Sequence, residues 1–132
     1  MNRVLRILIP TTALSLALTA CGGSGNTINV TMTDFAYLPN SFTVPAAAQI
    51  TINARNNGAT EHEFVIMKKG YTVTPPFGDK DEGNIYWELD QIEAGTTKTA
   101  TFTAPSEPGT YQVVCGLLAH IEKGMVATLI VK

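Results

Sequence analysis

The feature that most constrains this chain is the segment from Cys115 to Met125, which lies between two apolar, β-branched runs. The runs at 111–114 and 126–131 are each typical of a strand. Two strands joined in this way form a closed loop, which can bring separated side chains to one point. Three side chains of the segment carry donor atoms: the thiol of Cys115, the imidazole of His120 and the thioether of Met125.

These donors indicate a metal of a particular kind. A thiolate, a neutral imidazole and a weak axial thioether are three of the four ligands of a trigonal copper centre, and the fourth is a second histidine. The chain has only one other histidine, His62. It follows an Asn57-Gly58 turn and precedes the apolar run 64–67, so it lies where a strand begins.

Each of these residues also has an ordinary structural interpretation. A cysteine at a strand end is most often a small buried apolar residue, and a methionine in an apolar strand usually belongs to the core. The combination favours a metal site, because both histidines and Cys115 fit one four-ligand template.

Two segments resemble those of a known family. Residues 109–132, G-T-Y-Q-V-V-C-G-L-L-A-H-I-E-K-G-M-V-A-T-L-I-V-K, are similar to the C-terminal ligand loop of the cupredoxins, the small blue copper proteins. The Cys-x4-His-x4-Met spacing resembles that of rusticyanin-like and plantacyanin-like members. Residues 56–66, N-N-G-A-T-E-H-E-F-V-I, resemble the segment that carries the family's first ligand.

The resemblance covers about residues 28–132 and implies a fold, a cofactor and an activity. The fold is an all-β, cupredoxin-like Greek-key β-sandwich. The cofactor is one copper ion, Cu(I) or Cu(II), bound by His62, Cys115, His120 and Met125. The implied activity is electron transfer at a mononuclear type 1 (blue) site, without enzymatic catalysis.

The pattern of apolar residues independently indicates strands. Ile28, Val30 and Met32 alternate with polar residues, and residues 50–55 and 97–102 alternate in the same way. Turns rich in Gly, Pro and Asn separate these runs, and no long helical period appears. This pattern predicts an antiparallel sandwich.

Residues 1–21 have the features of an export signal. Arg3 and Arg6 precede a mostly apolar stretch that is short for a membrane span and ends at small residues. The alternative is a single transmembrane anchor. Leu18-Thr19-Ala20-Cys21 resembles a bacterial lipobox, which predicts lipidation of Cys21.

We therefore expect a signal peptide at 1–20, a Gly/Ser-rich tether at 21–27 and one domain at 28–132. Two cysteines in an exported protein would otherwise suggest a disulfide. If Cys115 binds metal, Cys21 has no partner, so lipidation is the simpler assignment. The expected location is outside the cytoplasm, at a bacterial cell membrane.

The net charge of the chain limits the classes of partner that we expect. The sequence has 9 basic and 11 acidic side chains, and removal of Arg3 and Arg6 with the signal leaves 7 and 11, a formal charge of −4. This balance does not favour nucleic-acid binding, which needs a basic face, and we expect no nucleic-acid partner. We expect a monomer that meets redox proteins such as cytochromes, or membrane electron-transport complexes.

The main alternative is a copper carrier or scavenger with the same ligands. Oxidases and nitrite reductases need more histidines than the two present, and a dinuclear copper site needs two cysteines in the loop. Self-contained copper-oxidase chemistry is therefore not expected.

The sequence departs from the family at three positions near the ligands. Glu63 follows the first histidine where Asn is common, and we hypothesise that its carboxylate, with that of Glu61, lowers the reduction potential. A solvated carboxylate that points away is the alternative. Ala119 and Ala127 stand where Gly is usual.

Two further features are open to two interpretations. Leu117, Leu118, Ala119 and Ile121 surround His120 and could form an exposed apolar patch for a transient redox partner, or the leucines could pack inward. The segment from Gly70 to Gln91 could cover the copper site or steer a cationic partner, or it could be a solvated loop whose Trp87 fills the core.

Overall fold

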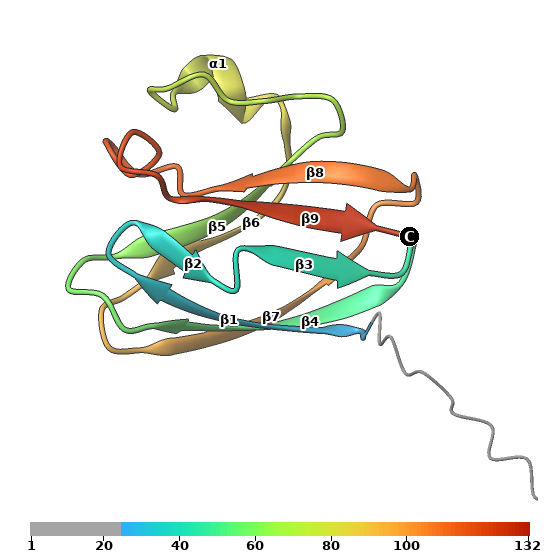
Figure 1. Cartoon of the computed structure of the whole chain (residues 1–132), viewed down its shortest axis with the longest axis horizontal. Coiled ribbons are helices and arrows are strands. Elements are labelled where there is room, and N and C mark those ends of the chain that lie inside the picture. Colours follow the sequence, from blue (N-terminus) through green and yellow to red (C-terminus); the bar gives the residue numbers. More distant parts are fainter. Residues whose placement is uncertain (1–24) are drawn as a thin grey trace, which may run out of the picture.

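The computed structural model describes residues 25–132, which form two packed β-sheets and one short helix (Figure 1). The strands are β1 (Thr27–Thr33), β2 (Ala36–Leu38), β3 (Ser41–Val44), β4 (Gln49–Asn56), β5 (His62–Met67), β6 (Ile85–Ile92), β7 (Thr97–Thr103), β8 (Gly109–Val114) and β9 (Val126–Val131), and the helix is α1 (Asp79–Glu82). The predicted all-β fold class is confirmed.

The two sheets have the orders β2-β1-β4-β7 and β3-β9-β8-β5-β6. The prediction of an antiparallel sandwich is wrong for two pairs, because β1 runs parallel to β4 and β3 runs parallel to β9. Alternation reports which face of a strand is buried and not its direction, so these parallel pairs left no signal in the sequence.

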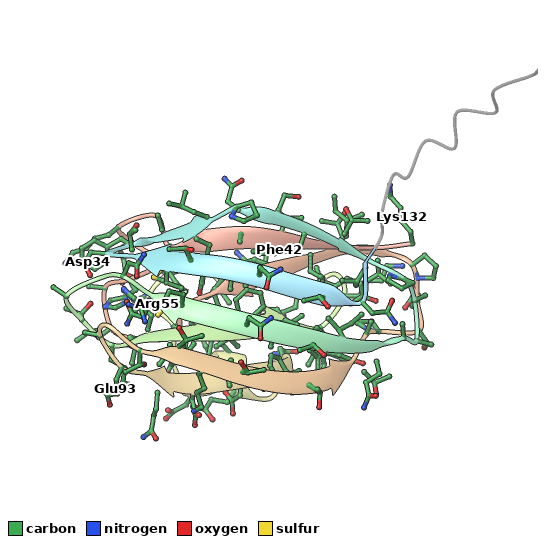
Figure 2. The ribbon with its side chains drawn as sticks, turned by 90° about the horizontal axis from the view of Figure 1, so that it is seen from below. Asp34, Phe42, Arg55, Glu93 and Lys132 are labelled. Carbon is green, nitrogen blue, oxygen red and sulfur yellow. The ribbon has the colours of Figure 1, made fainter. Side chains whose placement is uncertain are left out.

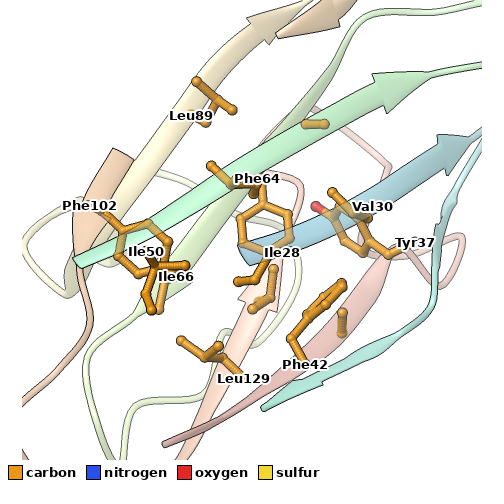
Figure 3. Close-up of a cluster of buried hydrophobic side chains, with 14 of the residues drawn as sticks. Ile28, Val30, Tyr37, Phe42, Ile50, Phe64, Ile66, Leu89, Phe102 and Leu129 are labelled. Atoms are coloured by element: carbon orange, nitrogen blue, oxygen red, sulfur yellow. The ribbon is translucent and has the colours of Figure 1, made fainter. Parts of the chain in front are cut away.

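The core lies between the sheets and follows the predicted alternation. Ile28, Val30 and Met32 of β1 are buried, and Ile50, Ile52 and Ala54 of β4 are fully buried. In Figure 3 labelled side chains from both sheets, among them Phe42, Phe64 and Phe102, point into this layer. Burying these apolar surfaces is the main favourable contribution to folding.

Strand β5 is buried on both faces, which explains its continuous apolar run. Phe64 and Ile66 join the main core, while Val65 and Met67 belong to a second cluster on the outer side of the five-stranded sheet. Val73 and partly buried Tyr71 and Phe77 complete that cluster, so the segment 70–84 covers this face. Figure 1 shows α1 of this segment above β8.

The structure corrects our interpretation of the segment from Gly70 to Gln91 as one long connection. It contains α1 and most of β6, which is an edge strand whose partly buried and exposed residues alternate. Trp87 is partly buried and stacks on Phe102 with ring centroids 4.6 Å apart. Asp81 is fully buried and accepts hydrogen bonds from Tyr71, Lys80 and the backbone of Gly78, which anchors the segment.

The loop that carries three of the four candidate donors lies at one end of the sandwich. The loop between β8 and β9 and the turn between β1 and β2 share that end, opposite the C-terminus (Figure 1). Figure 2 likewise places Asp34 of the β1–β2 turn and Lys132 at opposite ends. The described chain begins at the same end as Lys132.

The predictions for residues 1–20 and for Cys21 lie outside the described residues. Of the predicted tether only residues 25–27 are described, and Thr27 already belongs to β1. Within residues 25–132, no helix has both the length and the apolar character that crossing a membrane requires.

Candidate metal centre

His62 is positioned by a hydrogen-bonded turn that ends where β5 begins. Asn56, the last residue of β4, is fully buried and donates through Nδ2 to the carbonyls of Thr60 and Ile92, each at 2.7 Å. Its Oδ1 accepts the backbone N–H of Gly58 at 2.8 Å. Because one side chain closes the turn and joins it to β6, the backbone before His62 is fixed.

The other face of the same turn is held by Asp34. Its Oδ1 accepts the backbone N–H of Ala59 at 2.9 Å and lies 3.4 Å from both N and Oγ1 of Thr60. The same oxygen lies 3.5 Å from Nε2 of His62. These hydrogen bonds, chiefly the one from Ala59, hold the pKa of the Asp34 carboxyl below its usual value.

The loop between β8 and β9 positions the other three residues. The N–H of Met125 donates to the carbonyl of His120 at 3.0 Å, and the N–H of His120 donates to the carbonyl of Leu117 at 3.1 Å. A longer contact of 3.4 Å joins the N–H of Cys115 to the carbonyl of Met125. These bonds close the predicted loop, and Met125 is fully buried.

The donor atoms of three of the four residues predicted from the sequence converge. Nδ1 of His120 lies 3.3 Å from Nδ1 of His62 and 3.2 Å from Sγ of Cys115. One donor atom from each of the three residues lies within 4.8 Å of the others. His62 and Cys115 are fully buried and His120 is 8% exposed, so the three atoms face a small space closed to solvent on most sides.

The protonation equilibria of these residues suit a metal site. Burial lowers the pKa of both imidazoles. The neighbouring His120 ring lowers the pKa of His62 further, and the positive charge of Lys123 does the same for His120, so both rings are neutral donors at neutral pH. Burial raises the pKa of the Cys115 thiol to about 11, against hydrogen bonds from backbone N–H groups. Metal binding must then displace the thiol proton.

The sulfur of Cys115 lies under a cover made by two segments. The N–H of Glu63 donates to Sγ at 3.3 Å. The Glu63 carboxylate and the Phe77 ring lie close to Gly116, where a Cβ would be 2.8 Å from Oε2 of Glu63 and 3.3 Å from Phe77. The 70–84 segment therefore reaches the ligand loop through Phe77, as one of our two interpretations expected.

Glu63 links β5 to the ligand loop. Its half-buried carboxylate accepts a hydrogen bond from the backbone of Gly116, which ties β5 to the ligand loop. Burial raises its pKa, and the nearby carboxylates of Glu88, Glu61 and Asp90 act in the same direction. The alternative of a carboxylate that points away is wrong, while the effect of Glu63 on the potential stays a prediction.

The face around His120 is only partly the patch that we expected. Leu118 is 83% exposed, but Ile121 is buried and Leu117 packs against the core. An unexpected residue, Phe35, meets the His120 ring edge-on with centroids 5.1 Å apart. Nζ of Lys123 lies 4.2 Å from the centroid of the Phe35 ring.

The two alanines at expected glycine positions differ. Ala119 has φ +67°, a left-handed conformation that favours glycine, whereas Ala127 is a buried residue of β9. Asp34, Phe35 and Asn56 also belong to the site and were not predicted from the sequence. Only Asn56 had a local signal, because it adjoins the Asn57-Gly58 turn.

Comparison with known proteins gives consistent results. The family model described as "Cupredoxin-like domain" matches residues 6–131. Auracyanin-A from Chloroflexus aurantiacus is 26% identical over 86% of this chain and 88% of its own length.

Solved structures show the same relationship. Dithionite-reduced auracyanin from Roseiflexus castenholzii superposes with a TM-score of 0.70 at 32% identity and covers 83% of this chain and 99% of its own. Rusticyanin from Thiobacillus ferrooxidans superposes with a TM-score of 0.55 at 25% identity and covers 82% of this chain and 79% of its own.

Proposed function

Because this chain belongs to the cupredoxin-like domain family, we propose that it is a mononuclear type 1 copper protein that carries single electrons. The proposed ligands are His62, Cys115, His120 and Met125. The observation that supports the proposal best is the convergence of two Nδ1 atoms and one Sγ within 4.8 Å in a buried place. The similar auracyanin A is itself described as a "blue" copper protein.

The chemistry of the donor set fits copper. Two imidazoles and one thiolate in a trigonal arrangement with an axial thioether are the ligands of electron-transfer copper sites. The imidazole nitrogens that meet in the site are Nδ1 of His62 and Nδ1 of His120, 3.3 Å apart, and Sγ of Cys115 lies 3.2 Å from the latter. Copper, when bound, exchanges one electron between its Cu(I) and Cu(II) states.

The surroundings favour electron transfer over metal transport. The donors come from two segments: Asn56 fixes the turn before His62, and Glu63 ties β5 to the ligand loop, so the geometry is held by the fold. A site held in this way requires little reorganisation when the charge of its metal changes. A copper carrier must release its metal, and the full burial of His62 and Cys115 opposes release.

We propose that electrons leave through His120. Its ring is the only one of the three donors with measurable exposure, and exposed Leu118 lies beside it in the loop. Redox encounters are characteristically small and transient, and an apolar contact with a charged rim suits them. The proposed partners are redox proteins such as cytochromes, or membrane complexes, and no catalytic activity is proposed for a chain with two histidines.

We also propose a location outside the cytoplasm, with a lipid on Cys21. This proposal rests on the sequence of residues 1–21, which resembles an export signal with a lipobox. The described chain starts at the end opposite the ligand loop (Figure 1). An anchor upstream would thus hold the domain by that end and leave His120 accessible to partners.

The decisive experiment is optical and EPR spectroscopy of the detergent-solubilised full chain after one equivalent of Cu(II), with Cys115→Ser as the control. We expect an intense visible thiolate-to-copper band that disappears on reduction and is absent from the control. A colourless protein that binds Cu(I) tightly would replace the proposal with copper handling. Absence of binding would contradict both functions.

A further inference from the structure

We propose that Asp34 is a positioning residue for His62. In this proposal its carboxylate accepts the Nε2–H of the imidazole, which keeps Nδ1 free as the metal donor, and its negative charge favours Cu(II) over Cu(I). The second half of the proposal rests on the proposed copper function, and the first half can be tested without metal.

The first observation is a buried nitrogen without an ordinary partner. His62 is fully buried, and its Nε2 makes no hydrogen bond of normal geometry within residues 25–132. Buried polar atoms are nearly always satisfied, so such an atom needs an explanation. The group that faces it is the carboxylate of Asp34, whose Oδ1 lies 3.5 Å from Nε2.

The second observation is that the carboxylate is held in place. Asp34 belongs to the β1–β2 turn, yet its Oδ1 contacts the backbone of Ala59 and Thr60, just before His62. Its side chain is 39% exposed, but the oxygen that faces His62 is the one that receives these contacts. Because contacts from Ala59 and Thr60 hold this oxygen in place, the carboxylate can orient the ring, which a freely rotating carboxylate could not do.

The third observation is the glycine between them. A Cβ on Gly58 would lie 2.4 Å from Oδ1 of Asp34 and 2.8 Å from Nε2 of His62. Any larger residue would push the carboxylate and the ring apart. The absence of a side chain at position 58 therefore lets the Asp34 carboxylate and the His62 ring approach each other. Oδ1 of Asn56 holds Gly58 in this position by accepting the backbone N–H of Gly58.

The geometry has a direct chemical consequence. A neutral imidazole carries one N–H, and an acceptor at one nitrogen makes the other the lone-pair donor. Nδ1 of His62 is the atom that faces His120 at 3.3 Å, so the Nε2–H tautomer is the one that can bind metal. Carboxylates that accept the second N–H of a metal-binding histidine also raise the basicity of the ligand.

The alternative role for Asp34 is purely structural, as a cap for the Ala59–Thr60 turn. Two substitutions separate the roles. Asp34→Asn retains an oxygen that can cap the turn and accept from Nε2, but it removes the charge. Asp34→Ala removes the cap, the acceptor and the charge together.

The first test uses the metal-free full chain and ¹⁵N NMR of the histidine rings at a pH where both are neutral. We expect the Nε2–H tautomer of His62 to dominate in the wild type and in Asp34→Asn. In Asp34→Ala the ratio of the two tautomers should change by about tenfold, the effect of one hydrogen bond to a charged group. An unchanged ratio would overturn the positioning role.

A second variant protects this test against misfolding of Asp34→Ala. Gly58→Ala keeps the carboxylate but fills the space between it and the ring, so it should shift the tautomer ratio in the same direction. If Gly58→Ala folds and leaves the ratio unchanged, the contact has no orienting effect and the proposal fails.

The second test measures the affinities of Cu(II) and Cu(I) for the full chain. Asp34→Asn should reduce the preference for Cu(II) by about tenfold, at the low end of the effects of altering a group that hydrogen-bonds a metal ligand, because only the charge is removed. That change corresponds to a rise in reduction potential of about 59 mV for one electron.

The matched control is Glu122→Gln, which removes a carboxylate that acts electrostatically on His120 without contacting His62. Glu122→Gln should change the preference for Cu(II) over Cu(I) clearly less than Asp34→Asn does. Equal shifts in Asp34→Asn and Glu122→Gln would show that only net charge matters, and would overturn the proposed specific effect. If the wild type binds no copper, the proposed function fails, while the tautomer test still decides the role of Asp34.

Discussion

The two halves of the candidate metal centre are held by different forces. Around His62 the contacts are polar: Asn56 closes the turn, Asp34 faces the ring, and Glu63 links the strand to the ligand loop. Around His120 the contacts are apolar, with the edge of the Phe35 ring on one side and exposed Leu118 in the same loop.

This difference suggests a division of tasks between the two histidines. A fully buried ligand among fixed charges sets the preference of the site for one oxidation state, because charges act strongly where water is excluded. A ligand at the surface with an apolar rim gives a partner a short route to the metal. The following predictions test whether the two halves are separable in this way.

The largest expected effect is the loss of either histidine. His62→Gly and His120→Gly should both lose the normal visible band of the copper-loaded protein. Excess free imidazole should restore a coloured site in His120→Gly, because the vacated position adjoins solvent, but not in His62→Gly, whose position is fully buried. Optical titration measures both, and equal rescue would contradict the comparison.

The next effect concerns the stability of the His62 half. Asn56→Ala removes one buried and two partly buried hydrogen bonds and leaves the carbonyls of Thr60 and Ile92 without this donor, which should cost about 3 kcal/mol. Denaturant unfolding of the metal-free protein measures this cost. Asn57→Ala, one residue away and exposed, is the matched control and should change stability by less than about 0.5 kcal/mol. Similar losses in both variants would mean that the buried amide has no special role.

How much of this site could be predicted depends on how far apart in the sequence the interacting residues lie. Cys115, His120 and Met125 lie in one loop between clear strands, and the only other histidine supplied the fourth candidate. Asp34 left no such signal, because it reaches His62 only through the parallel pairing of β1 with β4, which alternation cannot reveal.

The fold shows the same limit. The alternating strands β1 and β4 and the buried strand β5 were predictable, since their apolar residues mark the core. Strand β6 was missed, although Ile85, Trp87 and Leu89 alternate with exposed Tyr86, Glu88 and Asp90 as in a half-buried strand. The role of the 70–84 segment as a cover depends on Phe77 meeting Gly116 across 39 positions of sequence.

A smaller effect concerns the charge beside the sulfur. Glu63→Gln keeps an oxygen that can accept from the backbone of Gly116 but removes a negative charge that stabilises Cu(II). The reduction potential should therefore rise, by up to about 59 mV for a tenfold change in relative affinity. The control Glu88→Gln alters an exposed and therefore screened carboxylate, so its shift should be smaller. An unchanged potential in Glu63→Gln would leave Glu63 with the loop-holding role alone.

The smallest effect compares the two alanines that replace expected glycines. Ala119 has φ +67°, which costs an L-residue about 1 to 2 kcal/mol, while glycine adds about 0.5 to 1 kcal/mol of unfolded-state entropy. Ala119→Gly should therefore stabilise the metal-free protein by about 0.5 kcal/mol. Ala127→Gly, in buried and extended β9, should instead destabilise it by about 1 kcal/mol. If denaturant unfolding shows that Ala119→Gly stabilises the protein while Ala127→Gly destabilises it, the backbone strain lies in the loop that carries His120. If both substitutions destabilise it, Ala119 is not strained.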